Sequence, residues 1–158
     1  MGRRPTKAAD NPFCKARLEA ARYNDRLFSK DGAAELLGIS VSTLSDYELG
    51  ITKVVPPDMV LKMADLYNAP ELRNYYCREL CPLGGDMPVL ELEDLDRISI
   101  KALAAFRKLG ETKDLLLDIT EDGVIDESER PQLDKILGTL DELEQVAQSL
   151  KVWVKKNL

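Results

Sequence analysis

The sequence predicts an all-α protein in which five short helices are followed by a long antiparallel helical hairpin. Three observations predict this fold class. Capping residues, Pro and Gly punctuate the first 80 residues at short intervals. Apolar residues then recur at spacings of three, four and seven over two long stretches, as they do in amphipathic helices. Between the two parts, residues 81–88 contain two Pro and two Gly, a composition typical of a turn or linker.

The five short helices are expected between residues that can begin or end a helix. Asn11 can accept a hydrogen bond at a helix start, and Pro12 presets the backbone of the first turn. Ser29 and Ser40 offer the same kind of acceptor, and a Gly ends each of the two helices that they begin. We expect the helices at about 12–24, from Ser29 to Gly38, from Ser40 to Gly50 with Leu44 and Tyr47 facing inward, from Pro56-Pro57 to Tyr67, and from Pro70 to Leu80.

Two long amphipathic helices are expected in the second half, because apolar residues recur with helical spacing over 98–119 and 133–154. The break at Asp122–Asp126 is short and predicts an antiparallel hairpin whose second helix begins near Ser128 and Pro131. A hairpin of two helices buries only one seam, so its apolar stripes need another surface. We expect dimerisation to provide that surface, although docking on the first domain would also cover the stripes.

Composition divides the chain into a basic arm at 1–11, a helical domain at 12–81, a linker at 82–95 and the hairpin at 96–158. The first 80 residues carry 12 basic and 11 acidic side chains, whereas the remaining residues carry 10 and 17. The net charge of −6 therefore belongs to the second half. An acidic hairpin could bind a basic partner protein.

Composition also excludes several classes of function. The chain has no His, which removes Ser-His-Asp and Cys-His catalysis and His-containing zinc sites. It has no Gly-rich phosphate loop, so we expect neither an enzyme nor a cofactor, and we expect no metal site. Three Cys and no apolar signal segment favour a cytoplasmic chain with reduced thiols. No apolar run approaches the ~20 residues of a membrane span, so we expect no membrane association.

The stretch from residue 29 to residue 50 has the features of a helix-turn-helix. A short helix and a second short helix with a polar outer face flank a tight turn at Gly38. A DNA major groove ~12 Å wide accepts one such helix. In these residues the chain resembles the xenobiotic-response-element family of phage-repressor-like helix-turn-helix regulators, and the resemblance covers residues 12–80. It implies a five-helix, repressor-like domain that binds double-stranded DNA.

The resemblance also implies which residues contact DNA. Ser29 and Lys30 match the start of the family's second helix, which meets phosphate, and Thr52 and Lys53 lie in a loop that often does. The recognition helix corresponds to residues 40–49. It has none of the Arg, Gln or Asn side chains that make bidentate contacts to bases. The residues that match base-reading positions are Ser40, Val41, Ser42, Thr43, Ser45 and Asp46.

These features predict a sequence-specific DNA-binding transcriptional regulator of bacterial or mobile-element type. The resemblance implies a repressor more often than an activator. A homodimer would set two recognition helices about one DNA turn, ~34 Å, apart over a pseudo-palindrome. The alternative function is a protein-interaction adaptor that binds through the acidic hairpin and uses the helix-turn-helix as a scaffold.

Three further features each have two interpretations. Residues 1–7 form a basic arm that either enters a minor groove or is a mobile tail. Residues 118–129 either form a calcium loop, whose pattern they fit at six positions, or cap a helical turn. Cys77 and Cys81, with Cys14 in reach, are either a redox or metal group or idle thiols. In the same way, Arg17, Arg22 and Arg26 either extend a phosphate-binding face or pair with Glu19 and Asp25.

Overall fold

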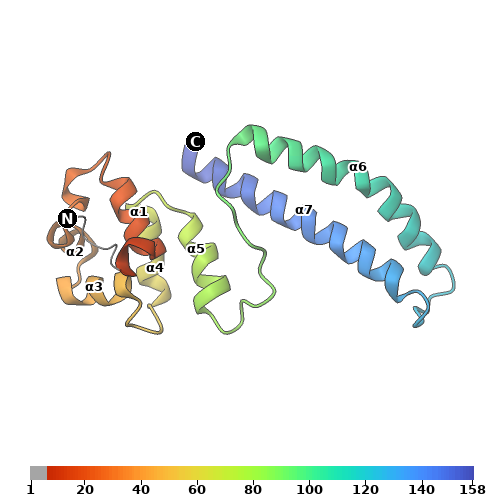
Figure 1. Ribbon diagram of the computed structural model, residues 1–158, viewed down its shortest axis with the longest axis horizontal. Coiled ribbons are helices and arrows are strands. Elements are labelled where there is room, and N and C mark those ends of the chain that lie inside the picture. The colour runs from red at the N-terminus through yellow and green to blue at the C-terminus, as the bar shows by residue number, and fades with distance from the viewer. Residues whose placement is uncertain (1–6) are drawn as a thin grey trace, which may run out of the picture. The chain divides into compact units, whose positions relative to one another are not determined.

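The computed structural model describes residues 7–158, and these residues contain helices and no strand. The predicted all-α class, with short helices followed by a long helix pair, is confirmed (Figure 1). The chain divides into two compact units, Met1–Met87 and Pro88–Leu158. Most of the basic arm, residues 1–6, lies outside the described residues. No helix of residues 7–158 is long and apolar enough to cross a membrane.

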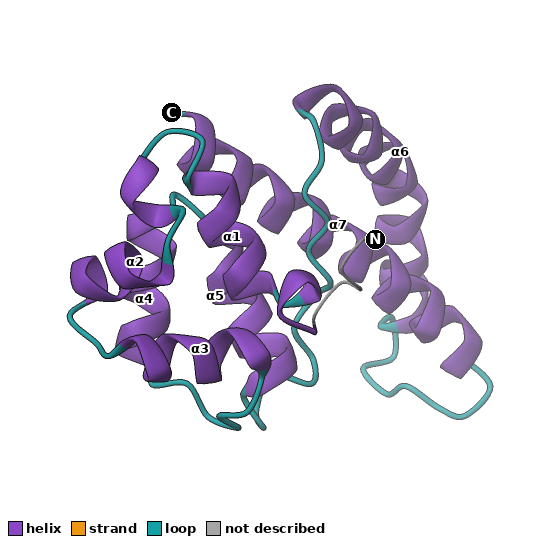
Figure 2. Cartoon of the chain, turned by 60° about the vertical axis from the view of Figure 1, so that its left-hand side comes forward, coloured by secondary structure: helices purple, strands orange, loops and turns teal. Residues whose placement is uncertain are grey.

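The described part of the first unit, residues 7–87, contains five α-helices, which pack around one another (Figure 2). Short 3-10 turns at Lys7–Asp10 and Asp25–Leu27 precede α1 and α2, and a π-helical turn at Tyr76–Leu80 continues α5. The α-helices are α1 (Pro12–Ala20), α2 (Lys30–Leu37), α3 (Val41–Leu49), α4 (Pro57–Leu66) and α5 (Glu71–Tyr75).

The caps expected from the sequence set the ends of α2 and α3. The Ser29 hydroxyl accepts from the backbone N–H of Gly32, and the Ser40 hydroxyl accepts from that of Thr43. Both helices end at a Gly in the left-handed region, with φ of 74° at Gly38 and 68° at Gly50. These local hydrogen bonds fix where the turn between α2 and α3 lies.

The predicted extent of the first helix is wrong, because α1 ends at Ala20 rather than Asn24. Asn24 adopts an extended backbone, and its side chain accepts from the N–H of Arg26. It therefore caps the following 3-10 turn and cannot also continue α1.

The core of the first unit is drawn from all five helices. Its most deeply buried side chains include Phe13 of α1, Leu44 of α3, Met63 of α4 and Leu72 of α5. Leu44 and Tyr47 are buried, as predicted for the inner face of the third helix. Packing against this core holds α2 and α3 in place, since isolated helices of eight or nine residues are unstable in water.

The second unit is a hairpin of α6 (Leu95–Ile119) and α7 (Arg130–Asn157). Buried residues of α6 recur every seven positions at Ile98, Ala105, Thr112 and Ile119, and they face α7 along one seam. On the surface of the hairpin, Lys108 and Glu142 form an ion pair at 2.7 Å.

The turn of the hairpin is stabilised by two reciprocal hydrogen bonds. The Asp126 carboxylate accepts from the N–H of Glu129, and the Glu129 carboxylate accepts from the N–H of Asp126. Asp126 also accepts from the hydroxyl and the N–H of Ser128. These contacts support the capped-turn interpretation of residues 118–129.

We expect this turn to make the hairpin sensitive to acid. Hydrogen bonds from Ser128, and a weaker one from the N–H of Glu129, lower the pKa of Asp126 below its ordinary 3.8. A lowered pKa stabilises the folded state above about pH 4, and this stabilisation is lost as the pH falls through the lowered pKa. The thermal unfolding midpoint, followed by circular dichroism from pH 5 downward, should therefore fall less steeply in Asp126→Asn than in Glu127→Gln. Equal slopes for the two variants would contradict this assignment.

Candidate nucleic-acid interface

The two helices α2 and α3 pack together and leave one side of α3 toward solvent (Figure 2). Leu44, Tyr47 and Glu48 form the buried side of α3. On the other side, Val41 and Ser42 are exposed, whereas Thr43, Ser45 and Asp46 are half-buried. The predicted base-reading residues thus lie on the accessible part of the helix and concentrate at its N-terminal turn.

A cluster of hydroxyl groups lies at this N-terminal turn. The Ser40 oxygen lies 2.9 Å from the Ser42 hydroxyl and 2.7 Å from the Thr43 hydroxyl. Each hydroxyl can donate or accept a hydrogen bond, and the Thr43 and Val41 methyl groups add apolar surface. This end of α3 can therefore offer hydrogen bonds and methyl contacts at once, without any charged side chain.

Lys30 connects α2 to α3. Its ammonium group donates to the Ser45 hydroxyl at 3.0 Å and lies 3.7 Å from the Glu48 carboxylate. The structure therefore brings Lys30 and Ser45 together. Of the other predicted phosphate contacts, Ser29 and Lys53 are exposed and Thr52 is half-buried.

A buried ion pair that sequence reasoning missed fixes α3 against α1. The Arg17 side chain meets the two oxygens of Glu48 at 2.5 and 3.0 Å, and it also donates to the carbonyl oxygen of Leu27. The side chains are 4% and 0% exposed, so both charges are removed from water. The signal was present in the spacing, since Glu48 follows the buried Leu44 by four residues and Arg17 follows the buried Phe13 by four.

This ion pair corrects the two interpretations given to Arg17, which neither extends a phosphate-binding face nor pairs with Glu19 or Asp25. Arg26 likewise pairs with Glu35, at 2.9 Å. Arg22 is exposed, and within residues 7–158 it forms no ion pair.

The ion pair also determines the titration of its neighbours. Burial disfavours the charged guanidinium, but the hydrogen bonds and charge of Glu48 outweigh burial and raise the pKa of Arg17. Burial and the Glu48 charge raise the pKa of the Cys14 thiol and of the Tyr67 hydroxyl. Cys14 and Tyr67 are therefore neutral at physiological pH and add no charge beside the ion pair of Arg17 and Glu48.

The other sequence motifs bring together no metal-binding group. Among residues 7–158, no three His, Cys, Asp or Glu side chains are arranged to hold a metal ion. Cys14 is buried, and Cys77 and Cys81 are half-buried free thiols.

A comparison with known protein families matches part of the first unit. Residues 16–74 match the family model of a helix-turn-helix domain. These residues, fewer than half of the chain, are similar to a helix-turn-helix domain. The match begins within α1 and ends within α5, so it includes α2, the Gly38 turn and α3. No curated protein and no solved structure shows significant similarity to the chain.

Proposed function

We propose that the protein is a sequence-specific DNA-binding transcriptional regulator, similar to the xenobiotic-response-element family, and that α3 enters the major groove. The observation that carries this proposal is the helix-turn-helix domain with an exposed N-terminal turn on its second helix. In this motif the N-terminal residues of the second helix contact base edges, while the first helix crosses the backbone.

The chemistry of α3 favours small, uncharged contacts to bases. The methyl groups of Val41 and Thr43 can contact the thymine methyl group, and the Ser42 hydroxyl can bond to either type of base edge. Asp46 can accept a hydrogen bond from the amino group of cytosine. Because none of these contacts is a strong bidentate pair, specificity requires more than one recognition helix.

Phosphate contacts are proposed around the edges of α3. The exposed N-terminus of α2 at Ser29 offers backbone N–H groups and a positive helix dipole. Lys53 supplies an exposed ammonium group in the loop after α3. Lys30 and Thr52 are half-buried. We propose that Thr52 contacts phosphate, and that Lys30 does so after it exchanges its bond to Ser45 for one to DNA.

We propose further that the regulator is a homodimer and acts as a repressor. Two copies of α3 placed ~34 Å apart would read a pseudo-palindrome and supply the specificity that one weakly basic helix lacks. A repressor needs only to occupy its DNA site, so it requires no surface beyond those that bind DNA and form the dimer.

Selection of bound fragments from a random DNA pool with the full chain tests this proposal. We expect an enriched inverted repeat whose half-sites are spaced by about one helical turn, and an affinity that falls steeply with salt. Failure to retard sheared genomic DNA at low salt would contradict DNA binding and favour the adaptor function, in which the acidic hairpin binds a basic protein.

A further inference from the structure

The hairpin leaves large apolar side chains outside its own seam. Three isoleucines are buried in the hairpin, Ile98, Ile119 and Ile136, and its other buried residues are small or carry hydroxyl groups: Ala105, Thr112, Thr139 and Ser149. By contrast, six bulky side chains remain between 41% and 61% exposed: Phe106, Leu109, Leu116, Leu117, Leu137 and Leu140. Burying such side chains contributes about 1.5–3 kcal/mol each, so this face of the hairpin favours contact with another surface.

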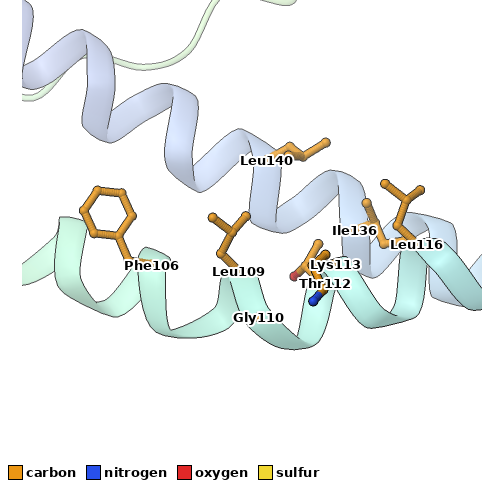
Figure 3. A pocket seen from close by; sticks show the side chains of 8 residues that line it. All are labelled: Phe106, Leu109, Gly110, Thr112, Lys113, Leu116, Ile136 and Leu140. Atoms are coloured by element: carbon orange, nitrogen blue, oxygen red, sulfur yellow. The ribbon is translucent and has the colours of Figure 1, made fainter.

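A groove of about 500 Å³ runs between α6 and α7 on this face (Figure 3). Phe106, Leu109 and Leu116 of α6 line it together with Ile136 and Leu140 of α7. Gly110 also lines the groove, and a Cβ added there would meet no atom within 4 Å. A Gly inside a helix costs about 1 kcal/mol relative to Ala, yet here it leaves an open hollow one turn after Phe106.

We propose that this face binds the same face of a second copy of the chain in antiparallel orientation, forming a four-helix bundle. The inference rests on the homodimer of the proposed function and not on DNA binding. In a two-fold interface both copies use the same surface, so this surface must contain both partners of every contact. Phe106 and the hollow at Gly110 meet this requirement, because Phe106 of each copy can fill the hollow of the other.

The charges of the hairpin favour a second copy in this orientation. The turn end, residues 111–141, carries ten acidic and three basic side chains. The open end, residues 88–108 and 142–158, carries seven basic and six acidic side chains, and Lys101 and Lys108 already pair there with Glu93 and Glu142. Antiparallel pairing places the acidic end of one copy beside the nearly neutral end of the other, whereas parallel pairing would bring the two acidic ends together.

The groove disfavours a basic peptide as its occupant. The one charged side chain that lines the groove within the described residues is Lys113, which would repel such a peptide. The exposed apolar side chains lie on both helices, from Phe106 to Leu117 of α6 and from Leu137 to Leu140 of α7, so a partner that covers both helices buries more of them than a peptide held in the groove alone.

Sedimentation equilibrium of the full chain tests the groove with a matched pair of variants. Gly110→Glu places a charge in the hollow. Gly138→Glu makes the same change at an exposed position of α7 that does not line the groove, and there too an added Cβ meets nothing within 4 Å. We expect a dimer in which Gly110→Glu raises the dissociation constant by about tenfold or more and Gly138→Glu by less than about twofold.

A second variant, Phe106→Ala, removes the side chain proposed to fill the hollow and should also weaken the dimer. Circular dichroism must show unchanged helix content in each variant, because Phe106 is 58% exposed and Gly110 lies in open space. If neither Gly110→Glu nor Phe106→Ala weakens the dimer, this inference is overturned and the proposed homodimer is not. A monomer overturns both the inference and the proposed homodimer, while DNA selection still tests the regulator separately.

Carboxyl-to-amine cross-linking of a mixture of isotopically light and heavy chains tests the orientation. Links between copies should join acidic residues of 111–134 to Lys151, Lys155 or Lys156. Inter-copy links that join the turn end of one chain to Lys113 or Lys135 of the other, without links to the C-terminal lysines, would overturn the antiparallel arrangement.

Discussion

Replacing Glu48 with Ala should lower the free energy of unfolding of the helix-turn-helix domain by about 3–5 kcal/mol. Glu48 is fully buried and meets Arg17, whose side chain is almost as deeply buried. Removing the carboxylate leaves the guanidinium charge without its counter-ion in the interior, a penalty that exceeds the value of an intact pair. Urea unfolding followed by circular dichroism measures the change.

The matched control is Glu35→Ala, which breaks the exposed pair between Arg26 and Glu35. Those side chains are 52% and 75% exposed, so the loss should stay below about 1 kcal/mol. Replacing both buried partners, as Arg17→Met with Glu48→Leu, should recover much of the stability, because no buried charge then remains. If Glu48→Ala proved as mild as Glu35→Ala, the pair would not hold α3 against α1.

Local chemistry made much of the fold predictable from the sequence. The starts of α2 and α3 follow from Ser29 and Ser40, whose hydroxyls bond to N–H groups three residues away. Their ends follow from Gly38 and Gly50, which adopt a backbone conformation that other residues avoid. These signals depend only on neighbouring residues and can therefore be recognised from the sequence alone.

Contacts between distant residues were not predictable in the same way. Arg17 and Glu48 are 31 residues apart, and single charged residues usually lie on the surface, so Arg17 was open to other interpretations. The position of Lys30 is similar, because its bond to Ser45 depends on the crossing of α2 and α3. For the candidate site, the sequence thus identified the helix and its outward residues but not which of them contact one another.

Replacing Ser42 with Glu should reduce affinity for DNA by about 100-fold or more without destabilising the domain. Ser42 is exposed at the second position of α3, on the turn proposed to enter the major groove. A carboxylate there would face the phosphates and base acceptors of DNA, and like-charge contacts at an interface cost several kcal/mol. A negative charge in the first turn of a helix is itself favourable by about 0.3–1 kcal/mol.

The opposite signs of these two effects separate binding from folding. Fluorescence anisotropy on the selected DNA should show the loss of affinity, while thermal unfolding should show an unchanged or slightly higher midpoint. Gln132→Glu is the matched control, because it adds the same charge to an exposed position in the first turn of α7, in the other unit. If both variants weakened binding equally, the effect would come from net charge. Wild-type affinity in Ser42→Glu would place α3 away from DNA, because a carboxylate buried in the interface opposite phosphate must lower the affinity.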